Sequence, residues 1–296
     1  MTGQRGHLTG RRGLVTGLLI VTGIGAAMAG CSTGPALGSA PPTASPAPRT
    51  ASPVPAASTG AHPPASQPAD PGPAATALAG QTIGIDPGHN GGNVADPAII
   101  NRIIWNGREN ETCDTTGTQT DGGYAEANFN WNVARYLRAD LRRAGARVVM
   151  TRHSNTGVGP CVTSRALILN HAGATVALDI HADGGPAWGR GFTVLEPVAD
   201  GPNDRIITAS ERLGSDVRAA LLKYTGMPVS NYYGHDGLIS RDDLAGLNLA
   251  TEPKVLIECG NMRNSTDARL LTASWFQRRL ARALQAALVT FLGTGH

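Results

Sequence analysis

Three segments of this chain place a metal-binding side chain beside the end of an expected strand or helix. His89 closes the run Asp86-Pro87-Gly88-His89 after an apolar strand, and His181 follows the run Ala177-Leu178-Asp179-Ile180. Glu126 lies in the first turn of an expected helix. Two imidazoles and one carboxylate form a known catalytic zinc set whose fourth position stays open to water. Such a site keeps a net positive charge, so its metal is a strong Lewis acid.

Each of these residues also has an ordinary structural interpretation. A histidine after a turn is usually a polar loop residue, and a histidine at a strand end is commonly a hydrogen-bonded boundary residue. A glutamate in the first turn of a helix most often complements the helix dipole. The three residues are far apart in the sequence, so no short-spacing rule for metal ligands applies. Spacing alone therefore leaves both the metal site and these structural roles open.

Strands and helices alternate from residue 81 onward. Apolar residues recur every fourth position from Phe129 to Leu141, which predicts an amphipathic helix. The expected strands are Gln81–Asp86, Arg147–Thr151, Thr175–Ile180, Gly191–Leu195 and Lys254–Glu258. The expected helices are Tyr124–Ala144, Ser164–His171, Asp204–Tyr224 and a last one carrying Phe276 to Leu292. This alternation predicts one α/β domain of three layers, with a central mixed, mostly parallel sheet flanked by helices.

The expected sheet explains how distant ligands can meet. Sites in open α/β sheets lie beyond the carboxyl ends of the strands, which is where His89 and His181 fall. The stretch from Asn90 to Gly123 is polar and rich in glycine. A loop of that length inside a compact domain is usually functional.

The first 31 residues have the layout of a secretory signal. Arg5, Arg11 and Arg12 form a basic start, and Gly13–Ala29 is an apolar stretch ending in small residues. The alternative is a permanent membrane span, for which the stretch has about the minimum length. Its glycine and alanine content, with no stop-transfer charges after it, favours cleavage.

A tether is predicted between the leader and the folded domain. Residues 32–78 are mainly Pro, Ala, Ser, Thr and Gly, which cannot bury enough surface to offset their ordering entropy. Fully extended, such a segment reaches on the order of 150 Å. The catalytic domain is expected over residues 79–296. The three leader arginines account for the whole formal charge of +3, which argues against nucleic acid as a partner.

Four motifs in the same order resemble the amidase-3 family of N-acetylmuramoyl-L-alanine amidases over about residues 81–292. They are Asp86-Pro87-Gly88-His89, the stretch Glu126–Arg152, Ile180-His181-Ala182-Asp183 and Ile257–Asn264. The resemblance implies that His89, Glu126 and His181 bind one Zn²⁺ and that Glu258 is the catalytic residue. Thr163-Ser164-Arg165 resembles another family segment, so Arg165 and Asp86 are candidates to support the site or contact the substrate. Met28-Ala29-Gly30-Cys31 likewise resembles a bacterial lipobox, which implies a diacylated Cys31.

The chain also departs from the family pattern. Asn90 follows His89 where the family usually has glycine, and Ala127 follows Glu126 where lysine is frequent. The segment from Asn93 to Gly123 does not align with a family pattern. These departures remove no ligand, but they leave the shape of the cleft and the preferred substrate open.

Three cysteines remain after Cys31. Export to an oxidising compartment predicts a Cys113–Cys161 disulfide, with three unpaired thiols as the alternative. Cys259 follows a buried strand and is expected to be a free core residue rather than a nucleophile, since no base lies near it in sequence. His235 is expected to be a solvated loop residue, and Arg241–Asn248 is a candidate wall of the substrate groove.

The resemblance implies a hydrolase that cuts the amide between N-acetylmuramic acid and L-alanine in peptidoglycan. Such an enzyme would serve wall turnover, remodelling or separation of daughter cells, outside the cytoplasm. A zinc peptidase acting on stem peptides and a non-catalytic wall-binding protein are the alternatives. We expect a monomer whose contact with the membrane is limited to the lipid anchor, and whose partner is peptidoglycan or a muropeptide.

Overall fold

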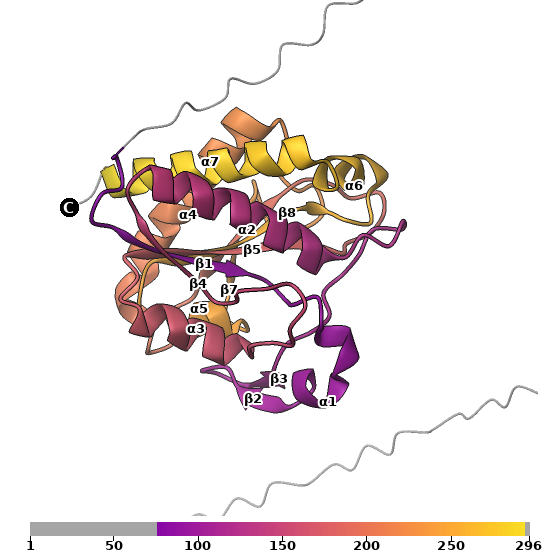
Figure 1. Cartoon of the computed structure of the whole chain (residues 1–296), viewed down its shortest axis with the longest axis horizontal. Helices are drawn as coiled ribbons and strands as arrows, with labels where there is room; N and C mark the ends of the chain where they lie inside the picture. Colours follow the sequence, from indigo (N-terminus) through magenta and orange to yellow (C-terminus); the bar gives the residue numbers. More distant parts are fainter. Residues whose placement is uncertain (1–75, 294–296) are drawn as a thin grey trace, which may run out of the picture. The chain divides into compact units, whose positions relative to one another are not determined.

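The computed structural model describes residues 76–293. The predicted leader, the lipobox-like Cys31 and nearly all of the predicted tether lie outside these residues. Figure 1 shows a central sheet between two layers of helices, as the alternation of strand and helix patterns predicts. Among the described residues, no helix combines the length and the apolar character that crossing a membrane requires.

The sheet has six strands in the order β4-β1-β5-β8-β6-β7. Strands β4 (Arg147–Met150), β1 (Thr82–Pro87), β5 (Val176–Asp183) and β8 (Lys254–Asn261) are mutually parallel. Strands β6 (Thr193–Pro197) and β7 (Leu238–Arg241) run together in the opposite direction, because β6 pairs antiparallel with β8. The predicted mixed, mostly parallel sheet is confirmed.

Long helices cover one face of the sheet. α2 (Glu126–Arg143), α4 (Ile207–Thr225) and α7 (Ser274–Gly293) pack there over the main hydrophobic core. Ile83, Leu178 and Ile257 belong to this core and are fully buried. The other face carries α3 (Val162–His171) and the short α5 (Ala245–Asn248), with a smaller cluster around Leu256.

The stretch expected to be a long loop contains short elements of its own. A 3-10 turn (Asn93–Ala95) and α1 (Pro97–Ile100) lead into the hairpin of β2 (Ile103–Trp105) and β3 (Asn110–Thr112). Neither an apolar period nor a strong turn motif marks these elements in the sequence, so they were not predicted. The elements β7, α5 and α6 (Ser265–Leu271) were not predicted either.

The Cys113–Cys161 disulfide is present, and Cys259 is a buried free thiol. The bridge joins the residue after β3 to the residue that caps the start of α3. The backbone N–H of Val162 also donates to the carbonyl of Cys113 at 2.8 Å. The hairpin segment is therefore fastened to the folded layers directly beside the site described next.

Candidate active site

The alternation of side chains along the strands separates core residues from candidate functional residues. On β5, Leu178 and Ile180 enter the main core, so Asp179 and His181 lie on the opposite face. On β8, Ile257 enters the core, and Glu258 lies beside His181 because the two residues are partners across the parallel ladder. Two distant segments thus bring a histidine and a glutamate together at the carboxyl edge of the sheet.

His89, Glu126 and His181 form one donor group, with one potential ligand atom from each within 4.8 Å of the others. Nε2 of His89 lies 3.3 Å from Oε2 of Glu126, and Nδ1 of His181 lies 2.9 Å from Oε1. Donor atoms about 2.0–2.2 Å from a tetrahedral Zn²⁺ lie roughly 3.3 Å from one another. The donor set therefore fits zinc in both chemistry and spacing.

The backbone around His89 is shaped for this approach. His89 has φ +56°, a left-handed conformation that is uncommon for a residue with a side chain and is concentrated at functional sites. Its neighbour Gly88 has no room for a Cβ, which would lie 2.1 Å from Cε1 of His181. Glycine at position 88 thus lets the two imidazoles meet, with ring centroids 4.9 Å apart.

Glu126 is fixed by donors from three parts of the chain. It is the first residue of α2, and its side chain is 5% exposed. The backbone N–H groups of Thr118 and Ala182 donate to its carboxylate at 2.9 and 3.2 Å, and Asn130 donates at 3.2 Å. These bonds leave little freedom to turn the carboxylate away from the imidazoles.

Within the donor group, the imidazoles and the carboxylate each favour the charged form of the other. Burial alone would lower the pKa of His89, but the charge of Glu126 and bonds to two carboxylates raise it to about 10. Burial would raise the pKa of Glu126, but the two imidazoles hold it well below its usual value. Without a cation, a proton on His89 balances the buried carboxylate, and a metal ion would take over that role.

Glu258 has an environment suited to proton transfer. Burial raises its pKa well above the usual value, and the charges of Glu126 and Asp183 raise it further. Among the described residues, its buried Oε2 has no hydrogen-bond partner. Leaving a buried carboxylate oxygen without a hydrogen bond costs free energy. A group that enters the cleft can therefore gain by donating a proton or a hydrogen bond to this oxygen.

Arg165 and Asp86 lie directly behind the donor group without belonging to it. The Arg165 side chain is 2% exposed, and its guanidinium donates to Asp86 at 2.7 Å and to Asp114 at 3.1 Å. It also donates to the backbone carbonyl of His89 at 2.9 Å. Burial would raise the pKa of Asp86, but Arg165 and Lys254 lower it to about 2. Arg165 thus ties the carboxyl end of β1 to the segment after β3.

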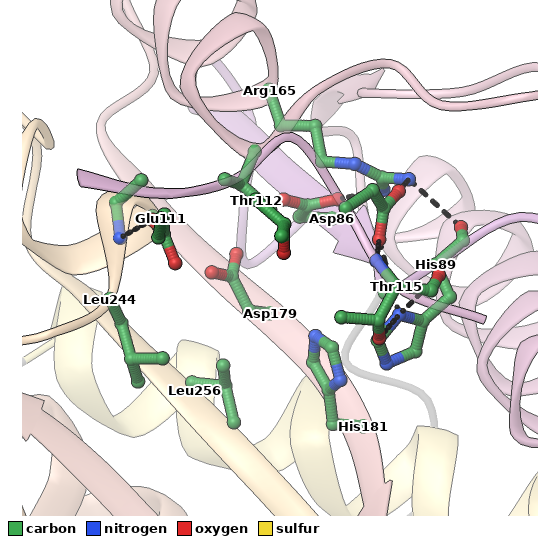
Figure 2. A pocket seen from close by; sticks show the side chains of 15 residues that line it. Asp86, His89, Glu111, Thr112, Thr115, Arg165, Asp179, His181, Leu244 and Leu256 are labelled. Atoms are coloured by element: carbon green, nitrogen blue, oxygen red, sulfur yellow. Dashed lines mark hydrogen bonds and ion pairs between the residues drawn. The ribbon is translucent and has the colours of Figure 1, made fainter. Parts of the chain in front are cut away.

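Two cavities extend from the pair of histidines. The first has a volume of about 170 Å³. Figure 2 shows His89 and His181 at one end of it, Glu111 at the other and Asp179 between them. The second measures about 490 Å³ and is lined by Glu258, Tyr232, Tyr233 and Arg241, together with both histidines. Arg241 and Leu244, from the segment expected to form a groove wall, line this second cavity.

Several residues of the site were not identified from the sequence. Asn130 stands one helical turn after Glu126, a spacing that could have identified it. Asp114 and Thr118 belong to the stretch without a recognisable pattern, and no local signal distinguishes them. His235 is exposed and lies outside the donor group, as expected.

Comparison with known proteins gives a consistent result. Residues 83–290 match the amidase-3 family, described as N-acetylmuramoyl-L-alanine amidase. An N-acetylmuramoyl-L-alanine amidase of Mycobacterium tuberculosis is 38% identical over 224 residues, which are 73% of this chain and 88% of that protein. The crystal structure of the N-acetylmuramyl-L-alanine amidase Ami1 from Mycobacterium smegmatis is 39% identical, with a TM-score of 0.69. It covers 73% of this chain and 99% of its own.

More distant structures share the fold. An N-acetylmuramoyl-L-alanine amidase from Clostridium difficile 630 matches with a TM-score of 0.56 at 20% identity, over 74% of this chain and all of its own. The resemblance drawn from the four motifs is confirmed by the family match over most of the chain. The chain therefore belongs to the amidase-3 family of N-acetylmuramoyl-L-alanine amidases.

Proposed function

We propose that this protein hydrolyses the amide bond between N-acetylmuramic acid and L-alanine of peptidoglycan, with one zinc ion per chain. His89, Glu126 and His181 would hold the ion. The observation that carries the proposal is the pairing of His181 with Glu258 across β5 and β8, which puts a partly buried carboxylate beside the donor group. When bound, zinc lowers the pKa of a water molecule to about 7, polarises the scissile carbonyl and offsets the negative charge around Glu258.

Glu258 acts as the general base of this reaction. Its Oε2 accepts a proton from the attacking water and then delivers it to the leaving amino group of L-alanine. A carboxylate with a raised pKa suits both transfers, because a shuttle works best when its pKa lies near the operating pH. The burial of Glu258 and the charges of Glu126 and Asp183 supply that increase.

The open cavity offers room for the substrate on the Glu258 side. Its wall carries the Tyr232 hydroxyl, which donates to Asp183 at 2.7 Å, and the Arg241 guanidinium, which pairs with Asp243. These polar groups are fixed before any ligand arrives, so they can orient a peptide at little entropic cost.

Mass spectrometry of digested muropeptides tests the proposal. Free stem peptides that begin with L-alanine, produced with zinc and lost after chelation, would support it. Shortened peptides left on the sugar would identify a peptidase instead. Unchanged muropeptides would indicate a binding protein without catalytic activity.

We further propose that residues 1–31 are a lipoprotein signal and that residues 32–78 tether the domain to the membrane through a lipid on Cys31. The support is the basic start, the apolar stretch and the small residues before Cys31. Labelled palmitate should enter the wild-type protein but not Cys31→Ser, which should leave the membrane fraction. Equal labelling of both proteins would contradict the lipid anchor.

A further inference from the structure

One imidazole nitrogen of His89 is turned away from Glu126 and faces the segment after β3. Nδ1 lies 3.2 Å from Oδ1 of Asp114 and 3.2 Å from the backbone carbonyl of Thr115. A carboxylate and a carbonyl can only accept, so Nδ1 carries the hydrogen. Nε2, which lies 3.3 Å from Glu126, is then the nitrogen whose proton a metal ion would replace.

Asp114 is itself held in one orientation. The residue is 3% exposed, and the backbone N–H of Thr115 donates to its Oδ1 at 2.7 Å. Its other oxygen accepts from Arg165 at 3.1 Å. The preceding residue, Cys113, is bonded to Cys161. The carboxylate therefore cannot leave His89 without breaking buried contacts.

The same short segment also contacts Glu126. The backbone N–H of Thr118 donates to Oε2 of Glu126 at 2.9 Å. Gly117 packs so closely that a Cβ would lie 2.7 Å from both Oε2 of Glu126 and Cδ2 of His89. Residues 114–118 thus form a wall behind two of the three donor side chains.

We propose that Asp114 is the positioning residue for His89, fixing the tautomer and ring orientation with which this imidazole binds the metal. A carboxylate on the far nitrogen of a ligand histidine also makes that ligand more basic, and losing such a partner typically costs 10- to 100-fold in metal affinity or activity. The inference rests on the proposed function only in taking His89 as a metal ligand. Asp114 need not touch peptidoglycan.

The test measures zinc affinity directly, without substrate. The dissociation constant of zinc is determined by competition with a coloured chelator for the wild type and Asp114→Asn. The asparagine can keep a hydrogen bond to Nδ1 but lacks the negative charge, so we expect zinc to bind roughly 10- to 100-fold more weakly. The Co²⁺-loaded variant should also show a shifted visible absorption spectrum, because the orientation of His89 changes the ligand field.

Two controls separate this role from a general loss of buried charge. Asp86→Asn removes the other carboxylate that pairs with Arg165 but leaves Asp114 against His89, so zinc affinity should fall clearly less than in Asp114→Asn. Asp140→Asn removes a buried carboxylate whose ion-pair partner is Arg143, and its zinc affinity should match the wild type. Melting temperatures of the metal-free variants report whether each one folds.

The outcomes distinguish a failure of the proposed function from a failure of the role proposed for Asp114. A wild-type protein that binds no zinc would contradict the proposed function together with this inference. Zinc binding by the wild type with unchanged affinity and Co²⁺ spectrum in Asp114→Asn would overturn the inference alone. An equal loss in Asp86→Asn and Asp114→Asn would also overturn it, because the effect would then come from the Arg165 ion pairs.

Discussion

Removing the Cys113–Cys161 bridge should destabilise the folded domain by about 4 kcal/mol. The two cysteines are 48 residues apart, and the chain-entropy model gives this value for a closed loop of that length. In a domain of this size, 1 kcal/mol corresponds to roughly 2–4 °C in melting temperature, so the expected drop is roughly 8–16 °C.

Thermal unfolding of the metal-free protein is the appropriate assay. The wild type is compared with the Cys113→Ser/Cys161→Ser variant, and each is measured with and without a reducing agent. Cys259→Ser is the matched control, because it replaces a buried cysteine that takes part in no bridge. Reduction should lower the melting temperature of the wild type and of Cys259→Ser, but not that of the double variant.

The size of the effect decides whether the reasoning holds. A drop of less than about 3 °C in the double variant would mean that the bridge does not restrict the unfolded chain as the entropy model requires. An equal response of the double variant to the reducing agent would place the sensitive bond elsewhere. Either result would refute the stabilising role assigned to this bridge.

Three further predictions concern the site and the pH dependence of stability. Glu258→Gln should keep its fold and its zinc but lose 10²- to 10⁴-fold in turnover, measured by stem-peptide release; near-normal rates would place the base elsewhere. Gly88→Ala should lose zinc because the new Cβ would collide with His181, whereas Gly122→Ala, whose Cβ would have no neighbour closer than 3.8 Å, should not. Burial, followed by a neighbouring carboxylate, raises the pKa of Glu196 from 4.5 to about 7. The folded state therefore binds the extra proton, and stability falls as the pH rises through that window. Glutamine carries no charge at either pH, so Glu196→Gln should raise the free energy of unfolding by about 1–3 kcal/mol more at pH 8 than at pH 4, measured by urea unfolding. Equal effects at the two pH values would contradict the raised pKa of Glu196.

The elements that could be predicted are those whose apolar residues form a regular pattern or an unbroken run in the sequence. Apolar residues four apart indicated α2, which runs over Glu126–Arg143 as expected to within two residues at either end. The apolar run before His181 indicated β5, although the strand continues to Asp183. The hairpin β2–β3 has three-residue strands whose side chains are mostly exposed, so no core contact imposes an alternating pattern on it. Such elements are held by tertiary contacts that a local pattern does not record.

The candidate site divides in the same way. His89, Glu126 and His181 were identified because the motifs around them resemble a family, and the structure brings them together. Asp114 was missed because the segment that carries it follows no family pattern, and its role depends on a contact 25 residues away in sequence. Metal ligands can be recognised from their residue types. The residues that orient those ligands can be recognised only from the contacts that they make in the folded chain.

The direction of β1 has a consequence for how the enzyme reaches its substrate. The described chain enters the domain at the amino end of β1, and the donor group lies past the carboxyl end of the same strand. The six residues of β1 separate the two points by about 20 Å along the strand. A domain held from its N-terminal side would therefore present its cleft away from the point of attachment.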